Sequence, residues 1–172
     1  MIAQVYRSVG NSIVVDDHLH WMQLALEQAE LAAESDEVPV GAVVVLDGEL
    51  IAAAHNQTIT DSDPTGHAEI IALRRAGEQL GNYRLVECDL YVTLEPCAMC
   101  VGALVHARLH HLYFAADDPK AGAVRSAMTL LSAGHFNHQV DFTGGILAEP
   151  AGALLTGFFR GRRRRKKIGK AG

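Results

Sequence analysis

A repeating apolar pattern appears first between residues 19 and 33. Its positions are spaced by three and four residues, the period of one face of a helix. They are Leu19, Met22, Leu26, Ala29 and Ala33. Asp16 or Asp17 is placed to cap this helix, because a short acidic side chain accepts hydrogen bonds from the first free backbone N–H groups. The pattern predicts a helix that packs against a core.

A β-hairpin is predicted next along the chain. Residues 38–46 are rich in β-branched side chains, and residues 50–55 continue as an apolar returning strand. Asp47-Gly48 between them is a dipeptide that favours tight hairpin turns. This hairpin should open a sheet.

Beyond the hairpin the pattern alternates between helices and strands. Helices are predicted at 67–80, from Pro96 onward, at 123–133 and from 151 to about 167, and strands at 85–94, 109–114 and 140–142. A helical crossover between strands favours a parallel pair. The elements therefore predict an α/β fold, a three-layer α/β/α domain with a mixed five-stranded sheet and an antiparallel N-terminal hairpin.

Length and composition fit a single domain. The 172 residues suffice for a full core, and we place the domain at residues 16–161, between an N-terminal extension (1–15) of unassigned function and a basic tail (162–172). The three cysteines, two of them in one short motif, indicate a reducing compartment. No stretch is long and apolar enough to span a membrane. We therefore expect a cytoplasmic protein without a membrane partner.

The net charge of −5 conceals a strong asymmetry. Eight of the 15 basic residues lie between Arg160 and Lys170, so residues 1–159 hold 7 basic and 20 acidic residues, a balance of −13. Such a run is either a solvated, self-repelling tail or an arm that binds nucleic-acid phosphates. The residues alone leave both interpretations open.

The strongest chemical signal lies at Pro96-Cys97-x-x-Cys100. Proline suits the first turn of a helix, since it lacks the N–H that would be unpaired there. On that helix Cys97 and Cys100 would share one face, close enough to bind one tetrahedral metal. His67 would supply a third ligand from the start of a second helix, with Glu69 beside it.

The number of ligands predicts the use of the metal. Structural zinc sites usually have four protein ligands, whereas catalytic sites have three and a water, whose proton Glu69 would take and return to the leaving group. Cys88 is an alternative fourth ligand, but it would close the site, and a lone cysteine often packs as a small apolar residue. His106, His110 and His111 suggest a second metal site, but neighbouring side chains on a strand point to opposite faces, so we interpret them as structural.

A family resemblance rests on these residues and their flanks. His67-x-Glu69 and Pro96-Cys97-x-x-Cys100 form the H-x-E…P-C-x-x-C signature of the zinc nucleobase deaminases. Further matching runs are VPVGAV at 38–43, NYRL at 82–85, LYVTLEPC at 90–97 and FFR at 158–160. From about residue 18 to residue 163 the sequence resembles bacterial tRNA-specific adenosine deaminases.

The resemblance implies a fold, a reaction and a partner. It implies the cytidine-deaminase-like fold, one Zn²⁺ per subunit, a homodimer, and hydrolytic deamination of adenosine to inosine at the wobble position of a tRNA anticodon loop. The basic run is then more readily interpreted as an RNA-binding arm.

The resemblance also implies substrate contacts. Residues matching Asn56, Asp118 and Lys120 contact the target nucleoside, the preceding nucleotide and the RNA backbone, respectively. Asn56 could instead be a turn residue that satisfies local backbone groups. Phe158 and Phe159 suit core anchors, and Phe159 is our candidate for stacking on a splayed anticodon base.

Two other functions remain open. A deaminase of a small free substrate, such as guanine, cytosine or cytidine, shares the zinc motif but has no evident need of a basic arm. A non-catalytic zinc module that only binds nucleic acid predicts a closed metal site and no role for Glu69.

Overall fold

The predicted hairpin forms one side of a five-stranded sheet in the computed structural model, which describes residues 12–134 and 136–168. β1 (Gly41–Leu46) and β2 (Glu49–His55) pair antiparallel. The turn residues Asp47 and Gly48 both have a positive φ, 51° and 76°, as hairpin turns that match the strand twist require. Residues 1–11 of the expected N-terminal extension lie outside the described residues.

The strand order is β2-β1-β3-β4-β5. β1 pairs antiparallel with β3 (Asp89–Leu94) on its other side, whereas β3, β4 (His111–Ala116) and β5 (Asp141–Gly144) run parallel. The predicted mixed sheet is therefore confirmed. Because β3 and β4 are parallel and Leu94 is opposite Ala116, the segments that follow the two strands start side by side at the C-terminal ends of these strands. This end of the sheet is called its edge below.

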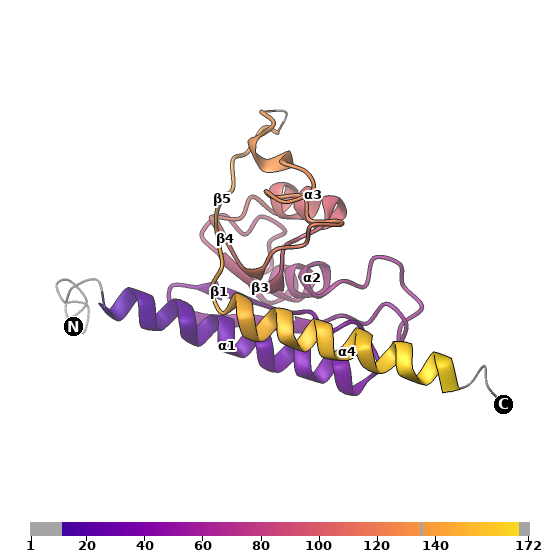
Figure 1. Cartoon of the computed structure of the whole chain (residues 1–172). Coiled ribbons are helices and arrows are strands. Elements are labelled where there is room, and N and C mark those ends of the chain that lie inside the picture. Colours follow the sequence, from indigo (N-terminus) through magenta and orange to yellow (C-terminus); the bar gives the residue numbers. More distant parts are fainter. Residues whose placement is uncertain (1–11, 135, 169–172) are drawn as a thin grey trace.

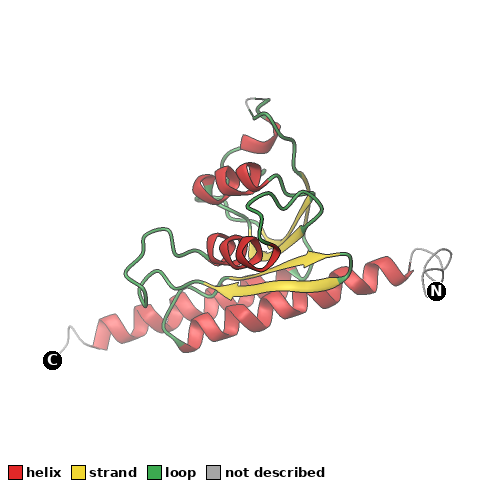
Figure 2. Cartoon of the chain, turned by 180° about the vertical axis from the view of Figure 1, so that it is seen from behind, coloured by secondary structure: helices red, strands yellow, loops and turns green. Residues whose placement is uncertain are grey.

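Helices cover both faces of this sheet, as Figures 1 and 2 show. α2 (Ala68–Leu80) and α3 (Ala98–Ala107) lie on one face, and α1 (Ser12–Glu34) and α4 (Ala148–Ile168) lie side by side on the other. The three-layer α/β/α architecture is confirmed. None of the helices in the described part of the chain is long and apolar enough to cross a membrane.

Alternate side chains of β3 belong to two apolar clusters on opposite faces of the sheet. Leu90 and Val92 are buried on the side of α2 and α3, whereas Tyr91 is buried with Met22 on the side of α1. Gly41 brings α1 very close to the sheet, since a Cβ at this position would overlap the backbone of α1. Both faces of the sheet are thus covered by packed apolar side chains.

The helix predicted at 123–133 is wrong. This segment consists of turns and one short 3₁₀ helix, η1 (Leu130–Ser132). The backbone N–H groups of Val124, Arg125 and Ser126 donate to the carboxylate of Glu95 and not to carbonyls within a helix. A distant side chain thus replaces the local hydrogen bonds that an α-helix would need.

Two predicted element boundaries are also wrong. α1 begins at Ser12, so neither Asp16 nor Asp17 is the residue that starts it. β3 begins at Asp89 because the residues before it form a turn, in which the Cys88 N–H donates to the Leu85 carbonyl at 3.0 Å.

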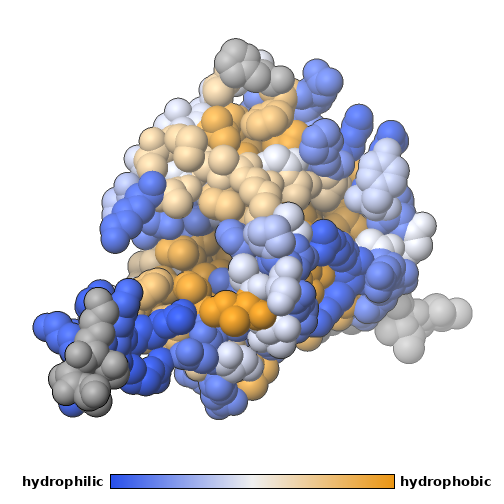
Figure 3. Space-filling view, turned by 90° about the vertical axis from the view of Figure 1, so that its right-hand side faces the viewer, coloured by the Kyte–Doolittle hydropathy of each residue, from blue (hydrophilic) through white to orange (hydrophobic). Residues whose placement is uncertain are grey.

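The basic run is the end of α4, which continues as a helix to Ile168. Arg165 Nη2 donates to Asp36 Oδ1 at 2.7 Å, which ties the run to the end of α1. Figure 3 shows the hydrophilic surface that gathers at this end of the molecule, at the lower left of the view. Residues 169–172 of the expected tail lie outside the described residues.

Candidate metal centre and active site

Three side chains meet at the edge of the sheet in the arrangement that zinc requires. The Sγ atoms of Cys97 and Cys100 are 3.8 Å apart, and His67 Nδ1 lies 3.7 Å from the first and 3.6 Å from the second. For tetrahedral zinc with bonds of about 2.3 Å to sulfur and about 2.0–2.1 Å to nitrogen, these edges should be about 3.8 Å and about 3.6 Å. The three donors therefore fit one zinc ion.

Both segments that carry the three donors are helix N-termini. His67 is the N-cap residue of α2 and Cys97 is the N-cap residue of α3, and neither side chain caps its own helix. Because α3 begins at Ala98, Pro96 precedes the N-cap residue instead of occupying the first turn as predicted. The side chains that usually satisfy the first N–H groups of a helix are thus turned towards the metal position.

Asn56 takes over the missing capping role for α2. Its side chain, 7% exposed, accepts a hydrogen bond from the Ala68 N–H at 2.8 Å and donates one to the Val38 carbonyl at 3.1 Å. Asn56 thus satisfies backbone groups, as one interpretation expected, but these groups lie 12 and 18 residues away and are not the local ones of a turn. The same side chain also lines the pocket described below, so a substrate contact is compatible with it.

Glu69 lies behind the metal position in the first turn of α2. It is 3% exposed, and burial raises the pKa of its carboxyl above the ordinary 4.5. The contact between the Cys97 and Cys100 sulfurs, with a smaller effect of His67, outweighs burial and lowers the pKa of Cys97 to about 3. A carboxyl that holds protons more readily beside a thiolate ligand is suited to acid–base work at a metal.

The metal position opens into a pocket of about 320 Å³. Its lining includes His67, Glu69, Cys97, Asn56 and Asp118. This volume is at the small end of the range for ligand pockets, which suits a single base-sized group.

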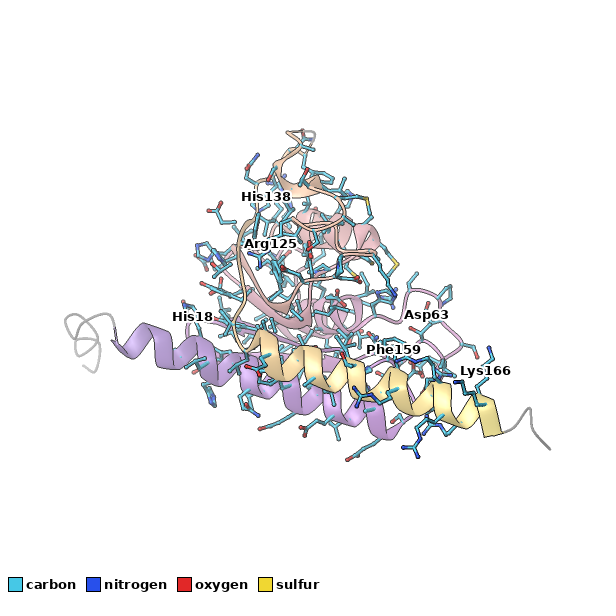
Figure 4. The ribbon with its side chains drawn as sticks, viewed as in Figure 1. His18, Asp63, Arg125, His138, Phe159 and Lys166 are labelled. Atoms are coloured by element: carbon cyan, nitrogen blue, oxygen red, sulfur yellow. The ribbon has the colours of Figure 1, made fainter. Side chains whose placement is uncertain are left out.

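A larger groove of about 670 Å³ adjoins this pocket and shares Asp118 with it. The groove is lined by Lys120 from the loop after β4 and by Phe159 and Arg163 from α4. Phe159 is 41% exposed, and Figure 4 shows it on α4 below the loop that carries Asp63. The structure therefore places all of the predicted substrate residues along the pocket and the adjoining groove, and Phe158 does not line either of them.

Cys88 and the three additional histidines lie elsewhere. Cys88 is 1% exposed within the apolar core. His110 pairs with Asp89 at 2.9 Å and His111 with Thr143 at 3.0 Å. Among the described residues, His67, Cys97 and Cys100 are the one group of three such side chains that could hold a metal ion.

Two buried carboxylates beside the pocket were not predicted. Glu37 is 1% exposed, and its Oε1 accepts from the Ile59 and Thr60 N–H groups, each at 2.7 Å. Glu95 is 2% exposed and holds the loop after β4. Burial raises the pKa of Glu95, but hydrogen bonds from Arg125 and Ser126 outweigh it and lower the pKa below 4.5. For Glu95 the available signal was its position at the end of the apolar segment 90–94, directly before Pro96-Cys97; the sequence around Glu37 carries no such signal.

Comparison with known proteins agrees with this geometry. The MafB19-like deaminase family matches residues 16–163. A tRNA-specific adenosine deaminase of Haemophilus influenzae is 48% identical over 151 residues, which cover 87% of each chain. The chain belongs to the tRNA-specific adenosine deaminase family. The resemblance inferred from the motifs is thereby confirmed.

Comparison with solved structures identifies the fold of this chain. A structure from a study of A-to-I editing by tRNA:A34 deaminases at the wobble position of transfer RNA is 48% identical, with a TM-score of 0.77, and covers 79% of this chain and 99% of its own. The cytidine-deaminase-like fold is confirmed. A guanine deaminase from Bacillus subtilis is 40% identical, with a TM-score of 0.56, over 58% of this chain and 64% of its own.

Proposed function

We propose that the chain hydrolyses adenosine to inosine at the wobble position of a tRNA anticodon loop. One observation carries the proposal. A three-donor zinc position with a buried carboxylate lies in a base-sized pocket, and this pocket continues into a groove that leads to the basic end of α4. Relatives that act on tRNA adenosine share nearly the whole chain.

The roles of the residues follow from their places. His67, Cys97 and Cys100 would hold one Zn²⁺ per subunit, and such an ion would supply the lowered pKa, about 7, that makes water a nucleophile at neutral pH. Glu69 accepts the proton of the attacking water and passes it to ring N1 of adenine. Glu69 then takes the remaining proton of the added hydroxyl and gives it to the amino group, so that ammonia leaves and the water oxygen stays on C6 as the carbonyl of inosine.

The pocket and groove would take a base that has left its stack. Asn56 uses one N–H of its amide for Val38, so its second N–H is available to the nucleoside. Asp118 would contact the preceding nucleotide, Lys120 the backbone, and Phe159 a splayed neighbouring base. An anticodon loop is already single-stranded, so little unstacking energy opposes entry.

Assembly and location are parts of the same proposal. We infer a homodimer in the cytoplasm, with the deaminase domain at 16–161 and the basic residues of 162–172 acting as a phosphate-binding arm. The segment 162–167 carries six consecutive basic residues on α4, and such a run supplies sequence-independent affinity for RNA.

Free guanine is the second candidate substrate, because a guanine deaminase shares 40% identity over part of the chain. A non-catalytic zinc module is disfavoured, since the metal group in the described residues has three members and not four.

The experiment compares RNA and free substrates with one zinc-quantified sample. Inosine should form in an anticodon stem-loop with a wobble adenosine, and a stem-loop with a wobble guanosine serves as the control. Guanine, cytosine and cytidine should release no ammonia. Ammonia from guanine without inosine in the RNA would overturn the tRNA proposal and leave a free-base deaminase.

A further inference from the structure

The loop that follows β4 is held by one side chain, Glu95. Oε1 accepts hydrogen bonds from the N–H groups of Val124, Arg125 and Ser126 at 3.0, 2.7 and 2.9 Å. Oε2 accepts from the Asp118 N–H at 3.0 Å and from the Ser126 hydroxyl. A carboxylate that is 2% exposed thus receives five hydrogen bonds from both ends of one loop.

Close packing shows that the loop is built around this carboxylate. Gly122 touches it, since a Cβ at this position would overlap the Glu95 carboxylate and lie 2.6 Å from the Asp118 carbonyl oxygen. The Ala123 N–H donates to the Pro96 carbonyl at 2.8 Å, and Gly122 pairs with Cys97 in an isolated antiparallel bridge. The loop is therefore fixed both to Glu95 and to the backbone beside a metal-binding cysteine.

The held loop carries the residues that face the substrate groove. Asp118 lines both the pocket and the groove, and its Oδ1 accepts from the Lys120 N–H at 2.9 Å. Arg125 lies at the other end of the loop, beside β4 in Figure 4, where its guanidinium donates to Asp117 at 2.7 and 2.9 Å. Any shift at Glu95 would move the Asp118 turn relative to the zinc position.

We propose that Glu95 is a positioning residue for substrate, which sets the Asp118–Lys120 turn against the metal centre. This inference rests on the proposed function. Glu95 takes no part in proton transfer, because both of its oxygens are occupied by loop donors. It acts through Asp118 on the capture of RNA.

The hydrogen bonds that Glu95 accepts from the loop explain why a carboxylate is needed at this position. Its two oxygens face four backbone N–H donors, whereas a glutamine has one oxygen and one donating NH₂ group. In Glu95→Gln the oxygen should stay with the three N–H groups of Val124, Arg125 and Ser126. The NH₂ group would then oppose the Asp118 N–H, so the loop should come free at its Asp118 end.

The test measures KM and kcat for the anticodon stem-loop. For Glu95→Gln we expect KM to rise about 10-fold or more, the effect of losing one hydrogen bond to a charged group, with a smaller change in kcat and unchanged zinc content. Gly122→Ala should raise KM similarly, because its Cβ displaces the intact carboxylate. Glu87→Gln, an exposed substitution in the turn before β3, is the matched control and should change neither constant.

A double variant separates positioning from general loosening. If Glu95 acts through Asp118, the variant Glu95→Gln/Asp118→Ala should have a KM within about two-fold of Asp118→Ala alone. Amide hydrogen exchange in Glu95→Gln should rise at the Asp118 end of the loop, residues 117–121, and stay unchanged at 56–66. The inference would be overturned if the double variant raised KM by the product of the two single effects, or if Glu95→Gln lost its zinc.

The outcomes distinguish this inference from the proposed function. If the unmodified chain forms inosine but Glu95→Gln keeps its KM, the inference fails and the function stands. If the unmodified chain forms no inosine, the function fails. Unchanged amide exchange at 117–121 in Glu95→Gln would overturn the inference whatever the substrate.

Discussion

Asn56 provides a prediction in which stability and catalysis can be separated. Asn56→Ala removes the acceptor of the Ala68 N–H and the donor to the Val38 carbonyl. Both lost bonds join backbone groups to a side chain that is 7% exposed. His67 next to Ala68 cannot replace the cap, because its ring is turned towards the metal position.

The magnitude follows from the two groups left unpaired. Each buried donor or acceptor without a partner costs about 1–3 kcal/mol, which gives roughly 2–6 kcal/mol for both. Asn56 lines the pocket, so water can enter the space and move the cost towards the lower end. We expect the free energy of unfolding to fall by about 2–3 kcal/mol.

The assay is urea denaturation at a fixed zinc concentration, since zinc binding itself stabilises the folded state. Asn82→Ala is the control. Asn82 also accepts a backbone hydrogen bond, from Arg84 at 3.0 Å, but it is exposed and should cost less than about 0.5 kcal/mol. Equal losses in the two variants would refute the argument that Asn56 caps α2 in place of His67.

Four further predictions concern the site and the basic run. Glu69→Gln should keep its zinc content but lose at least about 10²-fold in kcat, and wild-type turnover would disprove the proton shuttle. Removal of zinc by a chelator should lower the melting temperature and abolish activity, and added zinc should restore both. Deletion of residues 162–172 should weaken stem-loop binding and flatten its dependence on salt, as measured by fluorescence anisotropy; an unchanged slope would argue against the arm. Because the pKa of Glu95 is lowered, its contribution to stability is complete well above the ordinary value of 4.5 and is lost as the pH falls through the lower folded-state pKa. Between pH 6 and about pH 3 the urea midpoint should thus fall more in the unmodified chain than in Glu95→Gln.

The parts of the fold that local chemistry specifies were predictable. Asp47-Gly48 indicated the hairpin, and the spacing of Cys97 and Cys100 indicated one shared face at a helix start. Both features depend on residues within a few positions of one another. The same holds for His67 and Glu69, which lie in neighbouring positions at the start of α2.

Segment 123–133 was mispredicted because its hydrogen-bond acceptor is distant in the sequence. Its alanine-rich composition favours a helix, but Glu95 captures the N–H groups that a helix would need. Glu37 holds the loop after Asn56 in the same way. No periodicity reveals a side chain that bonds to backbone more than twenty residues away, so both carboxylates could be assigned only from the structure.

The helical conformation of the basic run has a consequence for how RNA would be held. Successive residues on a helix are rotated by about 100°, so six consecutive cations at 162–167 point in all directions around α4. One RNA strand cannot touch them all at once. If the end of α4 binds RNA as proposed, its attraction would depend mainly on total charge and little on which tRNA approaches, and discrimination would be left to the pocket beyond the groove.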